Sequence, residues 1–108
     1  MAKQDTSAAR LQFLGIYRLV PRLYVMSAWT RADEDKVQRH FARLQAEAKQ
    51  GRVILAGRTL EQNEKAFGIV VFEASTEPEA RAFMDSDPAV VGGVMTCELH
   101  PYRIAVSR

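Results

Sequence analysis

Few side chains in this sequence are suited to acid–base chemistry near neutral pH. The chain has two histidines, His40 and His100, and one cysteine, Cys97. Imidazole exchanges protons readily near neutrality, which makes the histidines the first candidates for general acid–base catalysis. Asp87 is the second candidate, although its place before Pro88 is also typical of a helix N-cap. The two roles are compatible, because one carboxylate oxygen can cap a helix while the other orients an imidazole.

The scarcity of thiols and imidazoles argues against a metal centre. A set made of His40, Asp87 and His100 follows no ligand-spacing motif, so we predict no metal and no cofactor. Cys97 has no basic neighbour that favours a thiolate, and we interpret it as a packed strand residue. One free thiol excludes an internal disulfide and suits a reducing compartment, so the chain is predicted to be cytoplasmic.

Length and charge exclude several classes of protein. The 108 residues suffice for one domain, and 47% apolar with 26% charged residues is an ordinary globular composition. A net charge of +2 is small for a protein that binds nucleic acid through its phosphates. The apolar stretch 13–17 ends at Arg18, too soon to span a membrane. We therefore predict neither a nucleic-acid partner nor a membrane partner.

The first strand of the domain is predicted over residues 22–29. This run follows Pro21 and is apolar, with β-branched and aromatic members. Residues 1–21 are accordingly predicted to be an N-terminal extension, and residues 22–108 a single domain.

An amphipathic helix is predicted next, over residues 33–50. Thr30 and Asp33 can both cap its start, and Gly51 supplies its end.

The second half of the chain reads as two strands, a helix, a short turn and a final strand. Strands are predicted over 53–57 and 67–72, followed by a helix that opens on the capping box of 76–79. Asp87 and Pro88 end this helix and open a short turn. The last strand is predicted over 94–105. Its Pro101 is allowed only at the edge of a sheet.

This order predicts a ferredoxin-like α+β fold, βαββαβ, with a four-stranded antiparallel sheet and two helices on one face. The expected spatial order of the strands is last, first, third, second. The outer face is predicted to carry Tyr24, Met26, Ile69 and Val71. A solvent-exposed aliphatic face of this kind is unusual for a monomer, so we predict a homodimer through the sheet face.

One alternative with the same element order is the RNA-recognition motif. Residues 65–72 match most of its octapeptide but fail at Ala66 and at Ile69, where an aromatic ring should stack on a base. Tyr24 would be a further ring on the neighbouring strand. Such a sparse platform makes RNA binding the least favoured function.

Four segments, taken in order, resemble the YciI-like (YCII-related) family. They are His40-Phe41-Ala42-Arg43-Leu44, the run from Gly51 to Gly57, Asp87-Pro88, and the run from Glu98 to Tyr102. The resemblance implies a dimeric α+β barrel, in which two ferredoxin-like sheets pack face to face. It also implies a catalytic His–Asp pair in a cleft, which by motif falls on His40 and Asp87. The sequence departs from the family pattern at Arg58, Ala89 and His100. The substrate is therefore not carried over.

The favoured hypothesis is a small enzyme in which His40 and Asp87 perform acid–base chemistry on a small organic molecule. The reaction would be a proton transfer or an elimination, as in an isomerase or a lyase. Gly57 and Arg58 are weaker candidates for substrate binding, since glycine permits close approach and arginine can hold an anion. The main alternative is a non-catalytic dimeric module that binds a small ligand in the same cleft.

Overall fold

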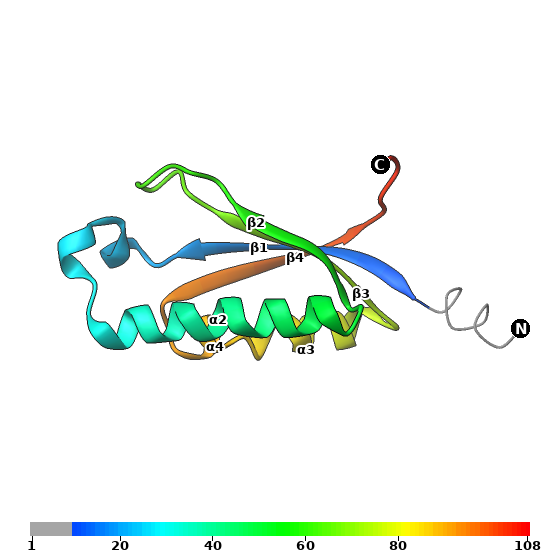
Figure 1. Cartoon of the computed structure of the whole chain (residues 1–108), viewed down its shortest axis with the longest axis horizontal. Coiled ribbons are helices and arrows are strands. Elements are labelled where there is room, and N and C mark those ends of the chain that lie inside the picture. The colour runs from blue at the N-terminus through cyan, green and yellow to red at the C-terminus, as the bar shows by residue number, and fades with distance from the viewer. Residues whose placement is uncertain (1–9) are drawn as a thin grey trace, which may run out of the picture.

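The structure of the chain, a computed structural model, describes residues 10–108. Its four-stranded antiparallel sheet has the order β2–β3–β1–β4. The strands are β1 (Leu11–Leu19), β2 (Val53–Arg58), β3 (Gly68–Ala74) and β4 (Met95–Tyr102). One face of this sheet is covered by α2 (Arg31–Lys49) and α3 (Glu77–Asp85), joined to β4 by the short α4 (Pro88–Val91) (Figure 1). The predicted α+β class and strand order are both confirmed.

The first strand lies earlier than the sequence analysis placed it. The prediction of a strand over 22–29 is wrong, because the strand spans Leu11–Leu19. Two short 3-10 helices follow it, η1 (Pro21–Tyr24) and η2 (Met26–Ala28). The sheet thus begins inside the segment 1–21 that was predicted to be an extension. The first nine residues of that segment lie outside the described residues.

Alternation along β1 explains why this segment is the strand. Phe13, Gly15 and Tyr17 are buried beneath the helices, whereas Leu14 and Ile16 are half-buried on the opposite face. A Cβ at Gly15 would come too close to the buried side chains of Met84 and Val70, so one of them would have to shift.

The apolar run that follows β1 folds as η1 and η2 and not as a strand. Pro21 stands in the first turn of η1, where its fixed φ suits a helical start. Val25 and Met26 are 58% and 75% exposed, which a buried central strand would not allow. Tyr24 and Met26 therefore do not lie on the outer face of the sheet, and that part of the prediction is wrong.

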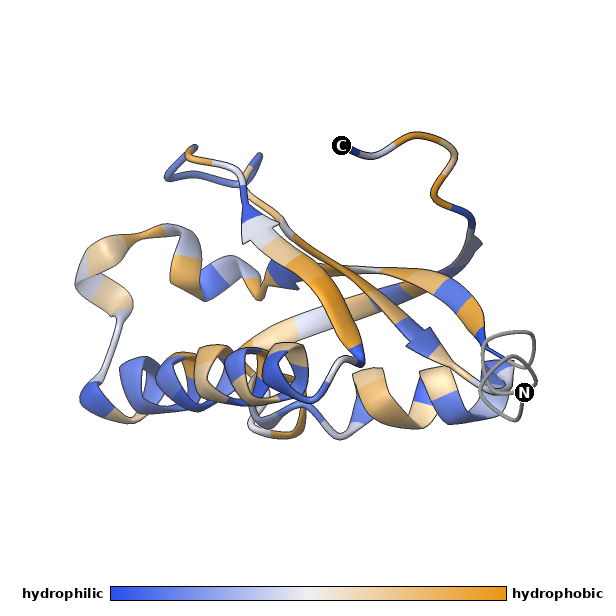
Figure 2. Ribbon diagram, turned by 45° about the vertical axis from the view of Figure 1, so that its right-hand side comes forward, coloured by the Kyte–Doolittle hydropathy of each residue, from blue (hydrophilic) through white to orange (hydrophobic). Residues whose placement is uncertain are grey.

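The outer face of the sheet is aliphatic along its centre. Val70 and Phe72 belong to the core beneath the helices, so Ile69 and Val71 point to the other side of β3, as predicted. The strand register extends this stripe to a set of five residues, Leu14, Ile16, Leu55, Ile69 and Val71. Figure 2 shows hydrophobic residues along much of β2 and β3. Within residues 10–108, no helix covers this face (Figure 1).

Local sequence signals set the ends of the helices. Thr30 and Asp33 form a capping box at the start of α2, and Gly51, with φ +89°, follows its end. Thr76 caps α3 by accepting a hydrogen bond from the backbone N–H of Glu79. Pro101 lies on β4, an edge strand, as predicted.

An ion pair ties η1 to the start of α2. The Arg22 guanidinium donates to both carboxylate oxygens of Asp33, at 2.9 and 2.7 Å. The Asp33 side chain also accepts a hydrogen bond from the backbone N–H of Thr30 at 2.8 Å. The bonds from Arg22 and Thr30 hold the pKa of Asp33 below its ordinary value.

Replacing Asp33 with asparagine (D33N) should therefore lower the free energy of unfolding at neutral pH, because it removes the charge that Arg22 pairs with. The pKa of Asp33 is depressed in the folded chain, so its contribution is complete above about pH 5 and is lost as the pH falls through the folded value. Urea unfolding should show a constant difference from the unmodified chain near neutrality that shrinks below about pH 4.

The control is D35N, which breaks the exposed pair between Asp35 and Arg39 and should change stability little. A D33N difference that grows on acidification would contradict this account.

Candidate active site

His40 and Asp87 are in direct contact. Nδ1 of His40 lies 2.7 Å from Oδ2 of Asp87. The two residues are 4% and 0% exposed. The predicted hydrogen bond between them is confirmed, and it joins two segments that lie far apart in the sequence.

Helix geometry brings the pair together. His40 is on the inner side of α2, three residues after Val37 and four before the buried Leu44. Asp87 is the N-cap of α4, where its Oδ1 accepts the backbone N–H of Ala89 at 2.8 Å. One carboxylate oxygen therefore caps a helix while the other holds the imidazole, and the two predicted roles coexist.

The charge state of Asp87 decides which nitrogen of His40 can react. Burial raises the pKa of Asp87, but the bond and charge of His40 and the Ala89 N–H outweigh it and lower the pKa below its ordinary value. An ionised carboxylate only accepts hydrogen bonds, so Nδ1 of His40 carries a proton and Nε2 is the nitrogen left to exchange one. Nε2 has no hydrogen-bond partner in residues 10–108. No fully buried side-chain nitrogen or oxygen there lacks a partner, so Nε2 opens to the cavity that His40 lines.

Two aromatic rings contact the imidazole. The ring of Tyr17, which is 2% exposed, meets it edge to face with centroids 4.6 Å apart, and that of Phe41 lies at 5.1 Å. The Tyr17 hydroxyl donates to Sδ of Met84 at 3.5 Å. Burial, together with the charge of Asp87, raises the pKa of Tyr17, so its hydroxyl stays protonated. Tyr17 thus packs against His40 as a neutral wall.

Arg43 completes the surroundings of Asp87. Its guanidinium donates to the backbone carbonyl of Phe83 and to Oγ of Ser86, both at 2.8 Å, and lies 4.0 Å from Oδ2 of Asp87. This role was not predicted from the sequence. The signal that could have indicated it is the three-residue spacing of Arg43 from His40, which places both side chains on one face of α2.

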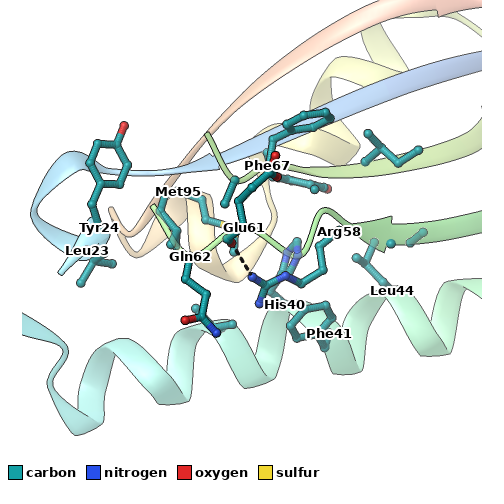
Figure 3. Close-up of a pocket in the computed structure, with 18 of the residues that line it drawn as sticks. Leu23, Tyr24, His40, Phe41, Leu44, Arg58, Glu61, Gln62, Phe67 and Met95 are labelled. Carbon is teal, nitrogen blue, oxygen red and sulfur yellow. Dashed lines mark hydrogen bonds between the residues drawn. The ribbon is translucent and has the colours of Figure 1, made fainter. Parts of the chain in front are cut away.

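A cavity of about 510 Å³ adjoins the pair. Figure 3 shows that α2, η1, the start of β4, and the end of β2 with the connection to β3 contribute its labelled residues. Its walls are largely apolar or aromatic, with Leu23, Tyr24, Met26, Trp29, Val37, Phe41, Leu44, Phe67 and Met95 among them. His40 is part of the wall and Asp87 is not, so the carboxylate supports the imidazole from outside the cavity. A mostly apolar cavity with a few polar groups is typical of a small-molecule site.

The weaker candidates, Gly57 and Arg58, also line this cavity. The Arg58 guanidinium donates to two backbone carbonyls, those of Thr59 at 2.9 Å and Glu61 at 3.4 Å. It forms no ion pair with a carboxylate of residues 10–108. A Cβ at Gly57 would meet open space, so packing within the chain does not require a glycine there. Substrate binding by either residue stays a prediction.

His100 and Cys97 are not part of this site. His100 is exposed on the outer face of β4, opposite Leu14, and cannot join His40 and Asp87 in a metal set. Burial, with the charge of Asp85, raises the pKa of Cys97, which keeps it a thiol. The part of the chain that the structure describes contains no group of three His, Cys, Asp or Glu placed to hold a metal ion. None of the helices described there combines the length and apolarity needed to cross a membrane.

The sheet does not display the rings that an RNA platform needs. Tyr24 lies in η1, outside the sheet, and the outward residues of β3 at its centre are Ile69 and Val71. The stacking surface is therefore poorer than the sequence alone indicated.

Comparison with known proteins gives a family and a fold. The YCII-related domain model matches residues 20–101. The fold is similar to that of 5-chloro-2-hydroxyhydroquinone dehydrochlorinase from Burkholderia phenoliruptrix in its complex with 2,5-dihydroxybenzoquinone. The TM-score is 0.64 at 18% identity, over 86% of this chain and 94% of that one. No curated protein gives a significant match.

Two substitutions at Asp87 separate its capping role from its charge. Asparagine caps helices about as well as aspartate, so D87N should keep the bond to the Ala89 N–H, whereas D87A loses it. Urea unfolding should therefore find D87A less stable than D87N by about 0.5–2 kcal/mol. Equal losses in the two variants would mean that the cap contributes nothing measurable.

Proposed function

Because the chain belongs to the YCII-related domain family, we propose that it is an enzyme that moves protons on a small organic molecule. His40 is the general acid–base group, and Asp87 orients it and supports its charge. The observation that carries this proposal is the 2.7 Å bond from Nδ1 of His40 to a buried carboxylate, beside a cavity that the imidazole itself lines.

The chemistry follows from the state of the imidazole. Nε2 takes a proton from a C–H or O–H group of the ligand, and the electron pair of that bond enters the ligand's π system. Asp87 stabilises the resulting imidazolium. Return of the proton to another atom gives an isomerisation. If the pair released by deprotonation forms a new double bond while a leaving group departs with the electron pair of its own bond, the result is an elimination. Both outcomes need an acid–base group with access to the ligand.

The walls of the cavity favour a flat ring that carries an anionic oxygen. Trp29, Phe41 and Phe67 supply aromatic surface. Arg58, which pairs with no carboxylate of residues 10–108, would hold the oxygen, with Gly57 beside it. The dehydrochlorinase of similar fold binds a dihydroxybenzoquinone. Hydroxylated rings are therefore the first ligands to test.

A non-catalytic binding module in the same cavity is the second candidate. It would use the apolar walls without needing a proton-exchanging group. The buried ionised carboxylate of Asp87 favours the enzyme, because taking a charge out of water is costly and an apolar residue would serve binding as well.

Proton exchange in D₂O tests the enzyme directly. Hydroxylated aromatics and small carboxylic acids are incubated with the protein, and deuterium uptake is followed by NMR. His40→Ala should slow exchange of a responsive compound by about 10²–10⁴-fold, since general acid–base catalysis contributes that much. D87N should also lose most activity while keeping its fold.

The matched control is His100→Ala, which removes the other histidine from the outer face and should leave the exchange rate unchanged. Compounds that bind in the cavity but take up no deuterium would support the binding module instead.

The outer face of the sheet is our proposed dimer interface. Its stripe of Leu14, Ile16, Leu55, Ile69 and Val71 is covered by no helix of residues 10–108. Val71 is already buried within the chain, but Leu55 is 51% exposed and Leu14, Ile16 and Ile69 are half-buried. Pairing two such faces would remove the apolar surface of these four residues from water. The lone thiol of Cys97 keeps a cytoplasmic location as our expectation.

Sedimentation at micromolar concentration should therefore find a dimer. Ile16→Glu places a charge within the stripe and should shift the chain to monomer, with circular dichroism reporting an intact fold. Gln38→Glu, an exposed position on α2 on the other side of the sheet, is the control and should remain dimeric. A monomeric unmodified chain would rule out the interface.

A further inference from the structure

We infer that Arg43 is a positioning residue that fixes the segment carrying Asp87. We infer also that it weakens the stabilisation that Asp87 gives to the protonated imidazole of His40. The inference deepens the proposed acid–base function and rests on it. It assigns a distinct task to a side chain that touches neither the cavity nor any ligand within it.

The first part of this task is mechanical. Arg43 bonds the last turn of α3 through the Phe83 carbonyl and the segment that follows through Ser86 Oγ, both at 2.8 Å. Its guanidinium also stacks 4.3 Å from the centre of the Phe83 ring. His40 and Arg43 lie one turn apart on α2, and both side chains bond to residues of the segment 83–87. These bonds fix the position of the carboxylate relative to the imidazole.

The second part is electrostatic. Oδ2 of Asp87 is 2.7 Å from Nδ1 of His40 and 4.0 Å from the Arg43 guanidinium, so the imidazole shares its counter-ion with a permanent cation. A carboxylate facing the imidazole alone would stabilise the imidazolium more strongly. Arg43 offsets part of that attraction and favours the neutral imidazole, the form that can accept a proton.

Other charged or titratable groups around the pair are unchanged in the test below. Tyr17 packs on the imidazole as a neutral phenol, and Cys97, its cross-strand partner on β4, has its Sγ 3.8 Å from Oδ1 of Asp85. Arg58 and Glu61 belong to the cavity wall that His40 also lines.

Arg52 provides a matched control. Its guanidinium lies 5.1 Å from the centre of the same Phe83 ring and pairs with Glu47, but it makes no ion pair with Asp87. Arg52→Gln therefore removes a cation from the same ring while leaving the counter-ion of His40 untouched.

The experiment follows the imidazole ring protons of His40 and His100 by NMR between pH 5 and 9 in the ligand-free protein. In Arg43→Gln the His40 curve should move to higher pH, because a charge next to the carboxylate is lost. Arg43→Lys restores the charge and should return the curve most of the way. Arg52→Gln should match the unmodified chain, and the His100 curve should coincide in all variants.

The inference is overturned if the His40 curves of Arg43→Gln and the unmodified chain coincide, which includes the case in which neither shows a titration. A shift of equal size in Arg52→Gln overturns it as well. Should Arg43→Gln not fold, Arg43→Met keeps an apolar stem over Phe83 and takes its place. The titration needs no substrate. Its failure is therefore distinct from a failure of the D₂O exchange assay, which tests the proposed function.

Discussion

The hydrogen bond between His40 and Asp87 is the constraint around which this half of the molecule is arranged. It places an ionised carboxylate at 0% exposure, which is tolerable only if every lone pair in use finds a donor. The imidazole and the backbone N–H of Ala89 in α4 supply those donors. The close approach of α2 to α4 brings the imidazole to the carboxylate, and the turn at Asp87–Pro88 brings the Ala89 N–H to it.

The site combines a rigid side and an adaptable one. On the rigid side, Asp87, Arg43 and Tyr17 hold the imidazole through bonds and packing to α2, α3 and β1. On the other side, η1, η2 and the hairpin after Arg58 are largely exposed and supply walls rather than chemistry. A scaffold of this kind can keep one acid–base group while the loops that select a ligand vary.

The helix ends and the cap at Asp87 could be predicted from the sequence, because they depend on neighbouring residues alone. The capping residues Thr30 and Thr76, and the Asp87–Pro88 pair, act within a few residues of where they stand, so their roles are readable without a structure. The strand assigned to 22–29 failed because apolarity alone does not distinguish a buried strand from a cavity wall. The better signal was the period of two at Phe13, Gly15 and Tyr17. The spacing of Arg43 from His40 shows that the two share a face of α2, but the place of Arg43 beside Asp87 also depends on how α2 packs on α3, which no local rule contains.

The central position of β1 has a consequence for how the protein is made. Gln12 pairs with Tyr102 across the sheet, so one side of β1 stays without its neighbour until Tyr102 has left the ribosome. Until then β1 exposes a row of unpaired backbone groups flanked by aliphatic side chains, a surface that other nascent chains can add to. Arrival of β4 closes that edge. Its own outer edge carries Pro101, which lacks the N–H that a further strand would need.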